Sequence, residues 1–197
     1  MRLSAIERPQ NPWMRLVYHL SKRQFGKVLM ALKVIYARKP RLVLIAQLIA
    51  RTQEKGISLE PSLRVLVQAK ISQLNGCPFC EDLALAQAVQ KRLGSERFRY
   101  LDAYRTSDAF SKRERTALAF AEEATRFRRV SDDTWLAARE NFSDTEIVEL
   151  VWLNAAENYF NLQAAVLGIE SDQLAERSMA AARELSHAAV RRPRGRA

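Results

Sequence analysis

The sequence predicts an all-α protein. Of its 197 residues, 48% are hydrophobic, whereas only 6 are glycine and 6 are proline, a composition that favours a compact helical chain. Apolar residues recur at spacings of three and four along most of the chain, which indicates helices with one buried face. No stretch alternates apolar and polar residues with β-branched enrichment, so we expect strands to be absent or trivial.

The first half of the chain contains five expected helices, separated by residues that stop a helix. Pro9 and Pro12 disfavour an earlier start, and Gly26, Gly56 and Gly94 are predicted breaks. The expected helices cover residues 13–25, 28–37, 40–54, 60–74 and 77–93.

The second half contains two matches to the capping-box pattern, Ser111 with Glu114 and Ser143 with Glu146, which mark helix starts. The expected helices there cover residues 95–104, 112–127, 131–141, 143–168 and 171–190. We divide the chain into an N-terminal extension with one helix (1–26), a helical domain (27–190) and a disordered basic tail (191–197).

The charge and the apolar segments exclude several classes of protein. The net charge of +10 is spread along the chain without zinc-finger spacing or an aromatic RNA-binding motif, which favours a basic surface over nucleic-acid binding. We read no signal peptide at the N-terminus. The apolar run 151–169 contains Asn154, Glu157, Asn158 and Asn161, so we expect it to be buried in protein and not in a membrane. Two cysteines suggest a reducing cytoplasm.

Both cysteines, Cys77 and Cys80, lie in one segment, Asn75-Gly-Cys-Pro-Phe-Cys-Glu-Asp82. Gly76 is expected to end one helix, and Pro78 suits the first turn of the next, so Cys77 falls at a helix N-terminus that favours a thiolate. The pattern is a dithiol redox signature, with a buried structural pair or half a zinc site as alternatives. Zinc would need further ligands, and the only histidines, His19 and His187, are near the chain ends.

The run from Leu63 to Cys80 resembles the core of the alkylhydroperoxidase D (AhpD) and carboxymuconolactone decarboxylase superfamily. Two later stretches, 110–125 and 142–161, support the resemblance, which spans roughly residues 27 to 175. It implies an all-α AhpD-like helical fold, assembly into homo-oligomers (trimers or hexamers), and a CxxC near a subunit interface. It also implies peroxide reduction in which Cys80 attacks, Cys77 resolves the sulfenate as a disulfide, and an external dithiol electron donor restores both thiols. No cofactor, metal or membrane is expected.

Three positions depart from the pattern of the peroxidase members. Their proton-relay glutamate and histidines correspond to Val65, Phe79 and Ala84 in this sequence, which are all apolar. Four polar residues could replace those proton or hydrogen-bond partners: Gln68, Ser72, Glu81 and Glu157. Glu157 interrupts an apolar helix, so it is either a buried carboxyl with a raised pKa that moves protons or, as we favour at this point, a packing group hydrogen-bonded between helices.

Four functions therefore stay open. The first is the thiol antioxidant enzyme just described, and the second is a dithiol-disulfide relay or redox sensor without peroxidase activity, which needs no proton relay. The third is a non-catalytic helical oligomer that keeps the cysteines for packing. The fourth, a lactone decarboxylase of the carboxymuconolactone type, is disfavoured because that branch generally lacks the CxxC.

Overall fold

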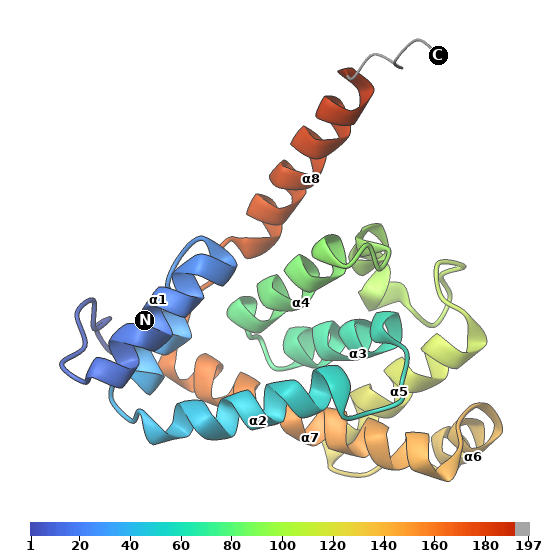
Figure 1. Cartoon of the computed structure of the whole chain (residues 1–197). Helices are drawn as coiled ribbons and strands as arrows, with labels where there is room; N and C mark the ends of the chain where they lie inside the picture. The colour runs from blue at the N-terminus through green and yellow to red at the C-terminus, as the bar shows by residue number, and fades with distance from the viewer. Residues whose placement is uncertain (192–197) are drawn as a thin grey trace.

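The computed structural model describes residues 1–191, with side chains through residue 184, and this part of the chain is helical without a strand (Figure 1). The α-helices are α1 (Pro12–Phe25), α2 (Arg41–Lys55), α3 (Pro61–Leu74), α4 (Pro78–Gln90), α5 (Lys112–Phe127), α6 (Asp132–Asn141), α7 (Asp144–Leu167) and α8 (Leu174–Arg191). A π-helical turn, η1 (Leu32–Tyr36), and a 3₁₀ segment, η2 (Ser95–Ala103), lie between them. The all-α prediction is confirmed.

Helix α3 is the centre of the fold, because it packs against α4, α5 and α7 (Figure 1). It is apolar on more than one side, as expected for a helix surrounded by others. Leu63, Val67 and Ile71 face α5 and α7, while Leu66 and Ala69 join a second apolar cluster with α4 and η2. This central position means that the loop after α3, which carries the cysteines, begins from a rigid support.

The predicted capping boxes at α5 and α7 are confirmed. Ser111 and Ser143 each accept the backbone N–H three residues on, and Glu114 and Glu146 each accept the N–H of their serine. These reciprocal contacts satisfy donors that an uncapped helix would leave free, which fixes where both helices begin.

Four of the expected bounds are corrected by the structure, and the remaining ones agree with it to within one residue. Residues 28–37 contain only the short η1, where Ala37 N–H donates to Leu32 O in a wide turn. Helix α4 ends at Gln90 and not at residue 93, since Arg92 adopts a left-handed φ of 55°. The other two concern α8.

Helix α8 begins at Leu174 and not at residue 171, because Asp172, the cap that the sequence suggests, bonds to other residues. Asp172 accepts the N–H of Met30 and pairs with Lys27, and Asp82 from α4 caps α8 in its place by accepting the N–H groups of Leu174 and Ala175. At the other end Arg191, placed by the sequence in the basic tail, is the last residue of α8. The rest of that tail, residues 192–197, lies outside the described residues.

The N-terminal extension packs on the side of the molecule that carries the cysteines. Met14, Val17 and Tyr18 of α1 belong to the same apolar cluster as Cys77 and Cys80. The hydroxyl of Tyr18 also donates to the carbonyl of Ile6 at 2.7 Å, which ties α1 to the residues before it. Helix α8 follows α7 and extends away from the helical body (Figure 1). Of the helices in the described part of the chain, none combines the length and hydropathy needed to cross a bilayer.

Candidate functional site

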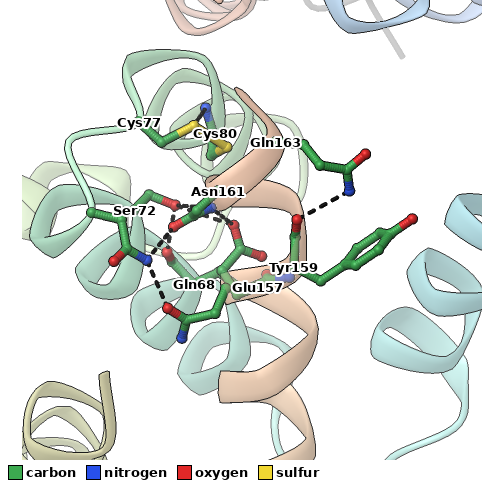
Figure 2. Close-up of a disulfide and its surroundings, with 10 residues drawn as sticks. Gln68, Ser72, Cys77, Cys80, Glu157, Tyr159, Asn161 and Gln163 are labelled. Atoms are coloured by element: carbon green, nitrogen blue, oxygen red, sulfur yellow. Dashed lines mark hydrogen bonds between the residues drawn. A yellow bond between two sulfur atoms is a disulfide. The ribbon is translucent and has the colours of Figure 1, made fainter. Parts of the chain in front are cut away.

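Cys77 and Cys80 form a disulfide at the start of α4, with their Cα atoms 5.4 Å apart (Figure 2). Asn75 is the C-cap of α3, Gly76 has a φ of +60°, Cys77 is the N-cap of α4 and Pro78 is its first residue. The predicted placement of the pair at a helix N-terminus is confirmed. The left-handed backbone alone favours glycine at position 76, since a Cβ there would meet no other atom within 4 Å.

The sulfur of Cys77 lies in a field that favours negative charge. The backbone N–H of Cys80 donates to Cys77 Sγ at 3.3 Å, and the positive end of the α4 dipole points toward it. The N–H of Cys77 itself donates to Ser72 O at 2.9 Å, which fixes the turn between the two helices. Once the disulfide is opened, the N–H of Cys80 and the helix dipole favour a thiolate at Cys77.

The two acidic residues after Cys80 are engaged by other groups. Glu81 Oε1 accepts from Gln73 Nε2 at 3.1 Å, and Asp82 caps α8. The expectation that Glu81 serves the thiols as a proton or hydrogen-bond partner therefore has no contact to support it among the described residues. Its role here is to pair with α3.

The disulfide is buried under apolar residues. Cys77 is 1% and Cys80 5% exposed, and both lie in one cluster with Phe79, Val34, Tyr36 and Ala164. Burial raises the pKa of the Tyr36 phenol, which therefore stays protonated. Val65 and Ala84 occupy a different apolar cluster, against Leu66 and Phe98. Val65, Phe79 and Ala84, the three positions at which the sequence departs from the peroxidase pattern, are thus packed among apolar side chains.

Glu157 lies in α7, buried among neutral polar groups (Figure 2). Its Oε1 accepts from Asn161 Nδ2 at 2.8 Å and from Ser72 Oγ at 3.2 Å. Burial raises the pKa of its carboxyl to about 7, against the opposing effect of hydrogen bonds from Asn161, Ser72 and their neighbours. Both sequence interpretations of Glu157 therefore describe it in part: it is a buried carboxyl with a raised pKa, and it bonds across from α7 to α3.

Asparagines connect Glu157 to the cysteine loop. The Nδ2 group of Asn75 donates to Asn161 Oδ1 and to Asn158 Oδ1, each at 3.0 Å. Asn161 in turn donates to Glu157, and Asn158 donates to the backbone of Asn154 at 2.9 Å. In Figure 2, Asn161 lies between the disulfide and Glu157. Since Asn75 is two residues before Cys77, the network ends at the loop that carries the sulfur.

The structure brings Ser72 and Gln68 to Glu157, and not to the sulfurs. Ser72 Oγ also donates to Gln68 O at 2.8 Å. Gln53 of α2 is 6% exposed and faces the same carboxyl, although its Nε2 makes no hydrogen bond of normal geometry to any described residue. The residue type gave no signal for it, because Gln47 in the same helix is also a glutamine and is exposed.

Two hollows on the part of the surface that the structure describes lie away from the cysteines. These shallow hollows of about 410 and 510 Å³ lie around Tyr104 and Phe127, and neither is lined by a residue of the cysteine site. Among the side chains that the structure describes, which run through residue 184, three or more His, Cys, Asp or Glu residues nowhere gather in a way that could hold a metal ion. The disulfide and its buried network are the candidate site.

Comparison with known proteins places this arrangement in a family. Residues 45–123 match the model of the carboxymuconolactone decarboxylase family. The chain is 30% identical to protein YnjA of Escherichia coli (strain K12) over 165 residues, which are 81% of this chain and 86% of YnjA.

Two solved structures share the fold. A protein of unknown function from Agrobacterium tumefaciens, ATU0492, superposes with a TM-score of 0.66 at 23% identity, covering 70% of this chain and 96% of that one. A peroxidase-related protein from Silicibacter sp. TM1040 does so with a TM-score of 0.76 at 19% identity, covering 88% and 93%. The helical fold, the matched segment and the relationship to YnjA together show that this chain belongs to the carboxymuconolactone decarboxylase family.

Proposed function

We propose that the protein is a thiol-dependent oxidoreductase that reduces a peroxide through the Cys77–Cys80 pair. The observation that carries the proposal is the disulfide between these residues at the N-terminus of α4, with Cys77 Sγ accepting the N–H of Cys80. The peroxidase-related protein from Silicibacter with the same fold supports the choice of a peroxide as oxidant. No cofactor takes part in the proposed cycle.

The cycle needs only the two sulfurs, a peroxide and an external dithiol. The Cys80 thiolate attacks one oxygen of ROOH, so that the O–O bond breaks, Cys80 becomes a sulfenic acid and ROH leaves after gaining a proton. The Cys77 thiolate then attacks the sulfur of the sulfenic acid, forming the disulfide and expelling hydroxide, which gains a proton and leaves as water. A dithiol reduces the disulfide by exchange, with Cys77 as leaving thiolate, and is itself oxidised. The order of attack follows the family resemblance, and the field around Cys77 suits both of its roles.

Mass mapping and peroxide consumption together test the proposal. We expect the reduced protein to form the Cys77–Cys80 disulfide when treated with hydrogen peroxide, and to consume peroxide steadily with dithiothreitol as donor. Cys80→Ser should abolish consumption, whereas Cys77→Ser should leave a sulfenic acid on Cys80 that a dimedone probe traps. Glu140→Gln, a change in an exposed ion pair with Lys112, serves as the matched control. Failure of the wild type to form the disulfide overturns the proposal.

A dithiol-disulfide relay is the second candidate. Its supporting observation is that Val65, Phe79 and Ala84 are buried apolar side chains, which leaves no relay histidine near the pair. It is the correct function if the disulfide forms and exchanges with dithiothreitol while peroxide consumption does not exceed that of Cys80→Ser.

For both candidate functions we propose that the protein works in a reducing cytoplasm, where a donor can restore the thiols.

We further propose that the protein acts as a homo-oligomer. Helices α2 and α7 contact each other and both carry exposed apolar rows, which we call the outer apolar face: Leu44, Ile45, Leu48, Val148, Val151, Trp152, Leu162 and Val166. Helix α2 buries only Val43 and Gln53 within its own chain. An apolar surface of this extent is typical of a protein interface, and a second copy of the chain is the occupant that the trimers or hexamers of the family resemblance imply.

A further inference from the structure

Thiol chemistry at Cys77 and Cys80 requires a place for protons, because each cysteine loses one on the way to the disulfide. The side chains that share the cysteines' apolar cluster supply no base, since burial raises the pKa of both phenols, Tyr18 and Tyr36, which stay protonated, and the others are apolar. Glu81 and Asp82 are held by Gln73 and by α8. Glu157 is the ionisable group that the hydrogen-bonded network connects to the cysteine loop.

We propose that Glu157 is a positioning residue whose protonation state depends on the state of the cysteine pair. Its carboxyl keeps a proton whenever one sulfur is a thiolate. It can release that proton once the two sulfurs are joined in the disulfide. This inference rests on the proposed thiol function and makes the reactivity of that site depend on pH. Glu157 makes no hydrogen bond to either sulfur in the described structure, so it acts through Asn161, Ser72 and the loop at Asn75.

The physical basis is repulsion between two negative charges in a buried region. A thiolate and a carboxylate close together in a medium of low dielectric cannot both form at neutral pH, so each raises the pKa of the other. The disulfide has no charge, and opening it introduces one. The proton on Glu157 compensates for that charge, with its carboxyl pKa of about 7 in the disulfide form as the starting point.

No charged side chain intervenes among the groups that face Glu157. Gln53 faces it from α2, Gln68 and Ser72 from α3, and Asn161 from its own helix, all of them neutral. From α5, the groups that contact α7 near Glu157 are the hydroxyl of Thr125 and the carbonyl of Ala121, and both accept hydrogen bonds from Asn154 Nδ2. From α4, Glu81 and Asp82 are the acidic residues, and both are bonded elsewhere.

The same surroundings suit Glu157 in both protonation states. Ser72 has one hydroxyl proton and can donate it to an ionised Glu157, or rotate it fully to Gln68 O and accept from a protonated Glu157. Gln53 Nε2 is a buried donor that has no partner of normal geometry, and it is available to an ionised carboxylate. A site that tolerates both states can exchange a proton without rebuilding the core.

The connection to the sulfurs runs along two routes of short contacts. One passes from Glu157 to Ser72, whose carbonyl accepts the N–H of Cys77 at 2.9 Å. The other passes through Asn161 to Asn75. In addition, Ala164, one turn after Asn161, packs in the same cluster as both cysteines. Both routes therefore connect the carboxyl of Glu157 to the loop that carries Cys77.

The test is a thiolate titration of the reduced protein, which needs neither peroxide nor partner. Thiolate is followed by its ultraviolet absorbance between about pH 5 and 9, a range that includes the ordinary thiol pKa, in the wild type, Glu157→Gln and the control Glu140→Gln. We expect the wild type and the control to titrate in two steps, with an inflection near pH 7. Glu157→Gln should titrate in one step, with about threefold to tenfold more thiolate at a given pH, which corresponds to a thiol pKa lowered by half a unit to one unit.

Superimposable curves for Glu157→Gln and the wild type overturn the inference, even if peroxide is consumed. Conversely, a protein that consumes no peroxide but shows the expected difference supports the inference and contradicts only the peroxidase proposal. Ser72→Ala provides an independent variant in case the glutamine substitution does not fold. It removes a hydrogen bond that lowers the pKa of Glu157, so the inflection near pH 7 should move to higher pH, and an unmoved inflection counts against the inference.

Discussion

The side-chain amide of Asn75 donates a hydrogen bond to the side-chain carbonyl of Asn161 across 3.0 Å, which joins the cysteine loop to the middle of α7. Asn75→Ala should lower the free energy of unfolding by about 1–3 kcal/mol, because it leaves the acceptors on Asn158 and Asn161 without their donor. Urea denaturation at pH 7 measures this loss. Asn141→Ala is the control, since Asn141 Nδ2 donates only within its own helix, to Ala137 O. A loss no larger than in the control would contradict the role of the Asn75 contact.

Glu157 should destabilise the folded protein as pH rises. Its carboxyl pKa is raised on folding to about 7, so the folded state binds the proton more tightly than the unfolded state does, and stability decreases between the unfolded pKa of about 4.3 and pH 7. Glu157→Gln removes this dependence. The free energy of unfolding of the wild type should therefore fall relative to that of the variant between pH 5 and pH 8. Urea midpoints at each pH measure this change. A constant difference across that range would mean that Glu157 does not titrate there.

The capping glutamates should give the opposite dependence. Hydrogen bonds from the Ser143 backbone and side chain and the ion pair with Arg113 lower the pKa of Glu146, and the backbone of Ser111 and the guanidinium of Arg97 lower that of Glu114. A lowered carboxyl pKa gives stability that is present above the unfolded pKa and lost as pH falls through the folded pKa. Thermal melts below about pH 4.3 should show this loss, and the double variant Glu114→Gln, Glu146→Gln should lose less on acidification than the wild type. An equal loss would assign acid denaturation to other carboxyls.

Asp82→Ala should loosen α8 while leaving the disulfide in place. The carboxylate of Asp82 accepts the first two N–H groups of α8, at 2.9 Å each, and a helix cap of this kind contributes about 0.5–2 kcal/mol. Limited proteolysis should therefore cut the variant earlier within residues 174–184. Asp133→Ala, in the first turn of α6, is the comparison. Identical cleavage of α8 in the wild type and Asp82→Ala would show that packing alone holds it.

Leu48→Glu should dissociate the proposed oligomer. Leu48 is 67% exposed on α2, so a charged side chain costs nothing in the free chain but is expensive in an apolar interface. Light scattering at micromolar concentration should give a mass above 22.5 kDa for the wild type and about that of one chain for the variant. Leu136→Glu on α6, where the leucine is 61% exposed, is the matched control. A monomeric wild type would contradict the assembly.

Local signals predicted most of what places the cysteines. Gly76 and Pro78 are adjacent to Cys77 and have strong conformational preferences, so the helix end and helix start on either side of the pair could be derived from sequence. The start of α8 could not be derived in this way. It depends on tertiary contacts: Asp172 bonds to Met30, whereas Asp82 of α4 caps α8. The same holds for Gln53, and for Met14 of α1 in the cysteine cluster. Contacts between distant segments decide these cases, and helical periodicity does not encode them.

The outer apolar face contains its own optical reporter. Trp152 is 39% exposed there, while Trp13 and Trp135 lie on α1 and α6. Indole emission shifts to shorter wavelength when the ring leaves water, so covering Trp152 in an assembly would give a blue shift on raising the protein concentration. A chain that keeps only this tryptophan, with Trp13→Phe and Trp135→Phe, would make its subunit equilibrium visible in a fluorescence dilution series without any added label.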